Sequence, residues 1–303
     1  MRADGELILG LLAIVGLGGP LLLGLTAVFW PQPPRAASGA PGWGLRLMLS
    51  STLLYALAFN LVFFVQELFL VWPKALTPGL EPVLFHNNHD WTGDNPLAEL
   101  LQGTGALAIL TLGVAASLWL TARPPRNVTV RLLLVWVAFH GLFQSLPQGV
   151  VGAAVPQNDV GRAMSWFGLS PPVLLAAALA SLAAMAVAGI WLSRPLLSLA
   201  TAPGEVENRW RRTRFVLMAG ALPAALGTLL VLPFRVPGSI DQVVIVPVAV
   251  AVLGSAWMLA GAWTAKSPRT PGADGLPAVA LPVAALLLVL AVFQLVLRPG
   301  IAF

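Results

Sequence analysis

The sequence contains no cysteine and little charge of either sign. Asp, Glu, Lys and Arg together make up 10% of its 303 residues, and only three residues are histidine. The absence of cysteine excludes disulfides, thiolate metal ligands and thiol nucleophiles, so any metal would need nitrogen and oxygen ligands. The scarcity of charge excludes an ordinary soluble domain, in which about a quarter of the residues are charged.

Hydrophobic residues dominate the chain instead. They make up 58% of it, and the mean hydropathy is +0.85, which together indicate an integral membrane protein whose main partner is the lipid bilayer. The net charge of +5 does not imply a nucleic-acid partner, because the basic residues stand in short loops between apolar runs. Retention of Lys and Arg on the cytoplasmic side of a membrane explains that placement.

Eight apolar runs are each long enough to cross about 30 Å of hydrocarbon as a helix. We therefore predict an all-α fold, a polytopic helical bundle that forms a single transmembrane domain over residues 1–303. The acidic residues before the first run argue against a cleaved signal peptide, so that run is counted as a span. The predicted helices cover residues 7–30, 45–72, 97–122, 128–155, 172–196, 215–234, 243–263 and 276–297.

The basic residues fall unevenly on the two sides of this bundle. Arg131 lies inside the fourth run and belongs to neither side. One side carries Arg35, Arg46, Arg123, Arg126, Arg194, Arg209, Arg211, Arg212, Arg214, Lys266 and Arg269, and the other carries Arg2, Lys74, Arg162, Arg235 and Arg298. The bias predicts a multi-pass protein of a bacterial-type cytoplasmic (inner) membrane with both termini extracytoplasmic.

The polar stretch from Glu81 to Gln102, between the second and third runs, is the densest in groups that bind metals or move protons. His86 and His89 are three residues apart, a spacing that lets two imidazoles share one ion on a helical turn. With Asp90 and Asp94 they form a candidate site for a divalent metal such as zinc. The alternative is an interfacial loop whose polar groups simply meet water and lipid headgroups.

Three further residues are candidates for proton transfer within the bundle. Glu67 lies near the outer end of the second run, Glu99 opens the third, and His140 lies near the middle of the fourth. Ionisable groups at such depths are costly and often functional. The alternatives are structural: Glu67 reaches the headgroups, Glu99 favours the start of its helix, and His140 donates to a backbone carbonyl.

The segment from Leu146 to Gly168 contains two prolines and four glycines as well as several polar residues. We expect a bent or re-entrant piece after the fourth helix, because irregular backbone at membrane depth survives only where protein or water lines it. This piece would bring Asp159 toward His86 and Glu67. In the alternative, Asp159 pairs with Arg162 in an exposed loop.

These features leave three hypotheses for function. The first is a metal-dependent membrane hydrolase in which His86 and His89, with a carboxylate from Asp90, Asp94, Asp159 or Glu67, hold a divalent ion such as zinc. An acid that is not a ligand, Glu67 or Glu99, would then act as base. The HExxH pattern of many zinc hydrolases is absent. The second is a proton-coupled transporter in which Glu67 and His140 exchange protons. The third is a non-catalytic subunit that docks to other membrane proteins.

Overall fold

The computed structural model describes residues 5–27, 29, 44–265 and 274–303. Within these ranges eight helices are long and apolar enough to cross a membrane, which confirms the predicted all-α polytopic bundle and its helix count. Most of the segment between the first two predicted helices and four basic residues of the orientation count fall outside these ranges: Arg2, Arg35, Lys266 and Arg269.

Several of the eight spans consist of more than one segment, because short π-helical turns interrupt them. The first span is α1 (Gly5–Ala13), η1 (Ile14–Gly18) and α2 (Gly19–Ala27). The next four are α3 (Leu45–Ala75), α4 with α5 (Leu97–Leu101, Thr104–Ala122), α6 (Val128–Ala154) and α8 (Pro171–Leu197). The last three are α9, η3 and α10 (Arg209–Val216, Leu217–Ala221, Leu222–Arg235), then η4 and α11 (Asp241–Ile245, Val246–Thr264), then α12 and η5 (Ala280–Ala291, Val292–Leu297).

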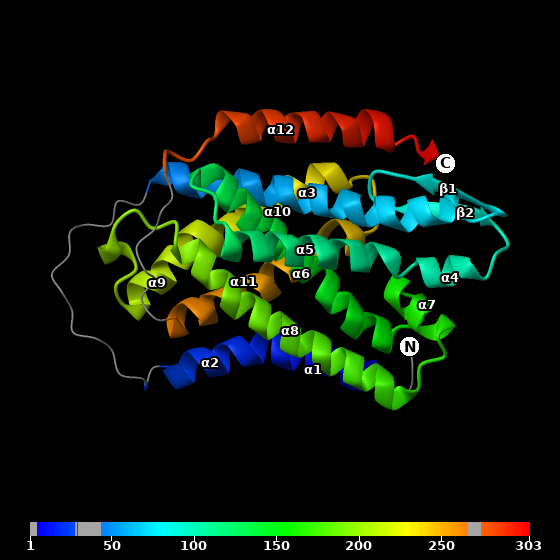
Figure 1. Cartoon of the computed structure of the whole chain (residues 1–303), viewed down its shortest axis with the longest axis horizontal. Coiled ribbons are helices and arrows are strands. Elements are labelled where there is room, and N and C mark those ends of the chain that lie inside the picture. Colours follow the sequence, from blue (N-terminus) through cyan, green and yellow to red (C-terminus); the bar gives the residue numbers. More distant parts are fainter. Residues whose placement is uncertain (1–4, 28, 30–43, 266–273) are drawn as a thin grey trace.

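The spans lie side by side along the long axis of the molecule (Figure 1). Strands β1 (Leu80–Leu84), β2 (His89–Gly93) and β3 (Ile301–Ala302) gather with α4 and the short helix α7 (Asp159–Trp166) at one end, which we call the hairpin end. Helix α9 lies at the opposite end, the basic end. Helix α1 begins at the hairpin end and β3 lies there too, as expected for an even number of spans.

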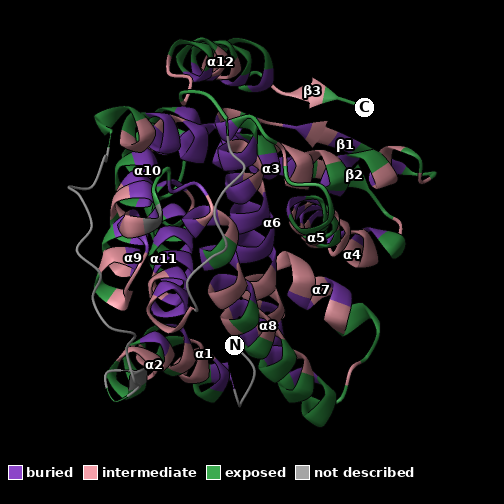
Figure 2. Ribbon diagram, turned by 60° about the vertical axis from the view of Figure 1, so that its left-hand side comes forward, coloured by how far each residue is buried: buried purple, intermediate pink, exposed green. Residues whose placement is uncertain are grey.

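Helices α3 and α6 form the centre of the bundle, where most of their residues are buried, while α12 is largely exposed (Figure 2). Helix α6 packs against α5, α8 and α3. Its contact with α5 is backbone to backbone, because a Cβ on Gly141 would lie 2.5 Å from the Cα of Gly113. Small residues of this kind let membrane helices approach closely.

The sixth predicted span begins earlier than its hydropathy indicates. Helix α9 starts at Arg209, where the Asn208 side chain accepts a hydrogen bond of 3.0 Å from the backbone N–H of Arg211. This N-cap extends the helix into a basic segment that a hydropathy pattern assigns to the loop. The basic residues from Arg209 to Arg214 are therefore helical.

The fourth helix and the segment after it agree with the prediction. Helix α6 continues through Pro147 and ends at Ala154, one residue before the predicted end at residue 155. Neighbouring helices allow proline within a membrane helix. The chain then turns, and α7 folds back on α6 through Gly152 and Gly161, whose contact leaves no room for a Cβ. The glycines thus permit the return of the chain.

The polar stretch after α3 forms a β-hairpin that the sequence analysis did not predict. Strand β1 pairs antiparallel with β2 in a register that sets Leu84 opposite His89, and β3 extends the sheet on the other side of β1. Gly79 and Gly93 have φ of 82° and 101°, which glycine adopts without strain. Because side chains alternate along a strand, burial of His89 leaves its neighbour Asp90 exposed.

Candidate functional site

A buried pair of ionisable side chains links the hairpin to α3. The Nδ1 atom of His89 lies 2.9 Å from Oε2 of Glu67, and Nε2 of the same ring lies 3.0 Å from Oε1 of Gln102. The imidazole of His89 is therefore held on both sides, by a carboxylate at Nδ1 and by a side-chain amide at Nε2. Glu67 and His89 are 5% and 8% exposed, which makes this a buried ion pair.

Cationic and aromatic groups surround this pair. The ring of Trp91 stacks on His89 with 6.0 Å between centroids. The Nζ atom of Lys74 lies 4.6 Å from the Trp91 ring centroid and donates to the carbonyl of Leu70 over 2.7 Å. Lys74 is fully buried, and the nearby carboxylates of Asp159 and Glu67 balance its charge. Charges of both signs therefore neutralise one another where α3 meets the hairpin.

Asp159, at the start of α7, belongs to the same electrostatic group. Burial raises the pKa of Asp159, and the positive charge of His89 opposes that shift. The neighbouring Glu67 carboxylate raises the pKa further. The structure thus brings Asp159 toward Glu67, as expected for the returning segment, and toward His89 where His86 was expected.

Glu99 lies at the edge of this group. Its Oε1 atom accepts a hydrogen bond of 3.0 Å from Nη1 of Arg162, and both side chains are substantially exposed. Glu99 is not among the residues that line the cavity described next. An exposed pair of this kind contributes at most about 1 kcal/mol to stability.

A cavity of about 430 Å³ lies beside the Glu67 and His89 pair, within the range of about 300–1,000 Å³ that is usual for small-molecule sites. Its polar lining residues, which we call the polar wall, are Gln66, Glu67, Asn87, Asn88, His89, Gln144, Gln148, Asn158, Asp159, Arg235 and Gln242. Its apolar wall comprises Leu12, Phe59, Phe63, Phe143, Pro147, Val151, Ile245, Val246, Ala249, Val250 and Leu253. The cavity is therefore amphipathic.

His86 has different neighbours from His89. It lies in the hairpin loop, is buried, and feels the charges of Arg298 and Arg235. Burial lowers the pKa of His86, while the backbone of Val236 opposes the shift. Neither ring nitrogen has a well-formed hydrogen bond to the residues the structure describes.

The predicted metal ligands are therefore not gathered in one place. Asp90 and Asp94 are exposed, and neither lines the cavity. Across the described residues, no group of three or more His, Asp or Glu side chains is placed to hold an ion. Of the predicted ligands, His89 and Asp159 share the cavity, together with Glu67.

His140 is enclosed by aromatic rings in the middle of the bundle. Its Nε2 donates to the backbone carbonyl of Tyr55 over 3.1 Å, and the rings of Tyr55, Phe59 and Phe139 lie within 4.4 to 5.2 Å of it, centroid to centroid. It does not line the cavity. This is the structural alternative set out for His140 above.

Two residues of the site, Arg235 and Lys74, were counted only as orientation signals in the sequence analysis. Arg235 is the last residue of α10 and is buried in the cavity wall. The sequence could have indicated the burial of both residues. Each lies within two residues of the end of a predicted apolar run, with no polar residue between, so its side chain is close enough to the bundle to be buried.

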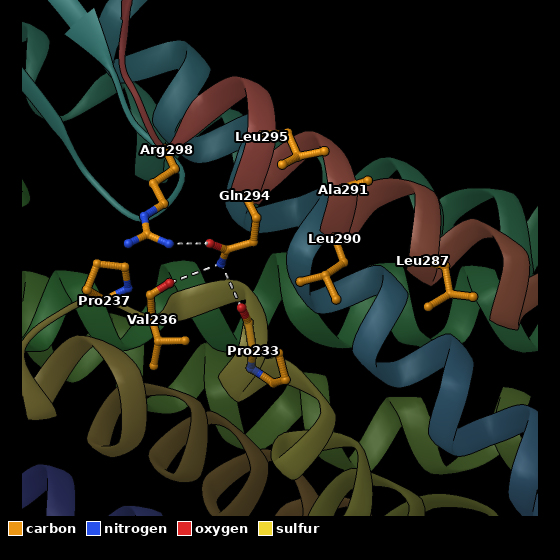
Figure 3. Close-up of a pocket in the computed structure, with 9 residues that line it drawn as sticks. All are labelled: Pro233, Val236, Pro237, Leu287, Leu290, Ala291, Gln294, Leu295 and Arg298. Atoms are coloured by element: carbon orange, nitrogen blue, oxygen red, sulfur yellow. Dashed lines mark hydrogen bonds between the residues drawn. The ribbon is translucent and has the colours of Figure 1, made fainter.

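A second hollow, of about 670 Å³, lies between the end of α10 and α12 (Figure 3). Gln294 bridges the two elements by donating to the carbonyls of Pro233 and Val236 over 2.7 and 3.0 Å. Arg298 donates to Gln294 over 3.4 Å. The other lining residues are apolar, and no carboxylate or imidazole is among them, so this hollow lacks the acid and base groups of the first.

No protein-family model matches the chain, and no curated protein or solved structure matches it either.

The buried Glu67 and His89 pair should show strong energetic coupling. In a double-mutant cycle with Glu67→Gln and His89→Gln, we expect a coupling energy of about 1–3 kcal/mol, because each single change leaves its partner buried without a counter-charge. The measurement is the free energy of unfolding in mixed micelles. The control cycle uses Glu99→Gln and Arg162→Gln, with an expected coupling of about 0.2–1 kcal/mol. Equal coupling energies in the two cycles would contradict the assignment of Glu67 and His89 as a buried ion pair.

His86 should make the protein less stable in mild acid. Its pKa in the folded state lies below the ordinary value of 6.5, so the unfolded chain binds more protons and the free energy of unfolding falls as the pH drops below 6.5. The slope from this one group is at most about 1.4 kcal/mol per pH unit. Thermal unfolding of His86→Asn between pH 7.5 and 5 should show a shallower loss than wild type. Superimposable curves would show that His86 does not contribute.

Proposed function

We propose that the chain is a proton-coupled carrier of a small molecule, with its binding cavity at the hairpin end of the bundle. The observation that carries this proposal is the ion pair of Glu67 and His89, which is buried and yet forms part of a cavity wall. An ionisable pair at such a position can release or take up a proton when a ligand arrives.

The closed part of the bundle supports the same proposal. On the side of the cavity toward the middle of the bundle, four fully buried side chains pack together: Tyr55, Trp136, Phe139 and His140. A cavity bounded on one side by such a core corresponds to one of the two states that a carrier alternates between. Proton exchange would then change the balance between the two states. We assign the proton to the Glu67 and His89 pair and not to His140, which lies outside the cavity.

The proposal also includes the orientation of the protein in the membrane. The described basic residues between the spans concentrate at the basic end, so that end would face the cytoplasm of a bacterial-type cell. The hairpin end, the cavity and both termini would face the extracytoplasmic side.

The chain lacks cysteine, so a single introduced thiol can report access to the cavity. For Val151→Cys in the cavity wall, we expect a membrane-impermeant maleimide applied to intact cells to react at a rate that changes about 5- to 150-fold between pH 5 and 8, beyond the reagent's own pH dependence. The exposed Asp94→Cys supplies that correction and reports which side the hairpin faces. Glu67→Gln in the Val151→Cys background should abolish the pH effect.

A corrected rate that does not vary with pH would overturn the carrier proposal and leave a static bundle, such as an accessory subunit. Labelling of Asp94→Cys only after the cells are opened would overturn the proposed orientation.

A second candidate function is a metal-dependent hydrolase, because Glu67, His89 and Asp159 all line one cavity. Their nitrogen and oxygen atoms are donors that zinc accepts. As the side chains are placed, they do not form a ready site, since His89 uses both ring nitrogens for Glu67 and Gln102. No step of a metal reaction is therefore derived.

Elemental analysis separates the two candidates. The second candidate predicts about one zinc per chain in protein purified without chelators. That zinc should be lost in His89→Asn and in Asp159→Asn, and retained in the control Asp94→Asn, whose side chain is exposed and outside the cavity. Zinc well below one equivalent, or zinc that the control also loses, would remove the hydrolase from consideration.

A further inference from the structure

We propose that the cavity binds an amphiphile with an anionic headgroup, such as a phosphate or carboxylate on an alkyl chain, and that Arg235 is the residue that binds the headgroup. This inference rests on the proposed role of the cavity as a binding site and gives it a substrate class.

The first argument is the state of the Arg235 guanidinium. Arg235 is 3% exposed, and its Nε and Nη2 atoms donate to the carbonyl of Gln242 over 3.3 and 3.1 Å. Its Nη1 atom is buried and has no hydrogen-bond partner among the residues described. A buried donor on a charged group is costly to leave unsatisfied, so a ligand acceptor at Nη1 would recover that cost.

The second argument is the charge around it. No described carboxylate forms an ion pair with Arg235. Glu67 is the acid whose charge acts on the guanidinium, but its Oε2 atom is committed to His89. Arg235 therefore keeps a positive charge in the cavity wall that no carboxylate of the described residues pairs. An anionic ligand would supply the missing counter-charge through charge-assisted hydrogen bonds.

The third argument is the geometry beside the guanidinium. The Cζ atom of Arg235 lies 3.7 Å from the ring centroid of Phe63 and 6.0 Å from that of Phe59, which fixes the guanidinium at the boundary between the two walls. Asn87 fixes the backbone that carries this side chain, since its Nδ2 donates to the backbone carbonyls of Arg235 and Pro237. The donor is thus held in position before any ligand arrives.

The fourth argument is the apolar wall. From Phe59 the cavity continues along Phe143, Val250 and Leu253, which present only hydrocarbon. A free inorganic anion would leave that surface without a partner, whereas an alkyl chain would cover it. The polar and apolar walls together select a molecule with a charged head and a hydrophobic tail.

The test is a titration of the purified full chain in dodecyl maltoside, followed by native mass spectrometry and thermal stability. The probes are dodecyl phosphate, dodecyltrimethylammonium, inorganic phosphate and the two-chain lipid dimyristoylphosphatidylglycerol. We expect one dodecyl phosphate per chain and a rise in melting temperature, with at least tenfold weaker binding of inorganic phosphate and of the cationic amphiphile. Tighter binding of the two-chain lipid would identify the source of the ligand as the bilayer.

Matched variants assign the headgroup site. Arg235→Gln should weaken dodecyl phosphate about tenfold or more, because a charge-assisted hydrogen bond is lost. Arg298→Gln, which removes an exposed arginine from the second hollow, should change the affinity by less than twofold. Ala249→Trp, which fills the apolar wall, should weaken the binding of dodecyl phosphate and leave the binding of inorganic phosphate unchanged. If Arg235→Gln does not fold, this variant still tests whether the amphiphile occupies the cavity.

Equal affinity for the cationic and anionic amphiphiles, or equal losses in Arg235→Gln and Arg298→Gln, would overturn the inference. Inorganic phosphate that binds as tightly as dodecyl phosphate would also overturn it. The thiol-labelling experiment needs no ligand, so a pH-dependent labelling rate without anion selectivity would remove this inference and keep the carrier proposal. Selective binding of the anionic amphiphile, together with a labelling rate that does not vary with pH, would keep this inference and remove the carrier proposal.

Discussion

The cost of placing charge in a medium of low dielectric constant governs the arrangement of the hairpin end. Several spans, the β-hairpin and α7 bring ionisable groups there, and each buried charge needs a partner. The ion pair of His89 and Glu67 is the contact that ties the hairpin to α3. Gln102 then holds the other side of the imidazole and ties the third span to the same point.

The transmembrane architecture could be predicted from the sequence because hydropathy and length determine it. The third predicted span, residues 97–122, agrees with α4 and α5 at both ends, and the others differ by a few residues. The clear exception is the sixth span, where a side-chain cap at Asn208 continues the helix into a charged segment. Capping depends on local hydrogen bonds that a hydropathy average does not register.

The site was less predictable, because it depends on which side chains meet across the fold. Glu67, His89 and Asp159 were named as candidates from their rarity in an apolar chain, and the structure brings them to one cavity. His86 was grouped with His89 because the two are close in sequence. The β-hairpin separates them, since its register turns His89 toward α3 and leaves His86 in the loop beside Arg235. Arg235 itself was only counted among the basic residues of one side of the bundle, because its burial results from the end of α10 lying against α3 and η4.

The contact between Gly113 and Gly141 has a consequence for the rest of the bundle. Two backbones that touch without intervening side chains interlock, so the helices that carry them cannot slide past each other without losing van der Waals contact along the whole seam. Helices α5 and α6 are therefore expected to move as one unit. In the proposed carrier, a change in the width of the cavity would then involve its other lining elements, the first span with Leu12 and α11 with Leu253.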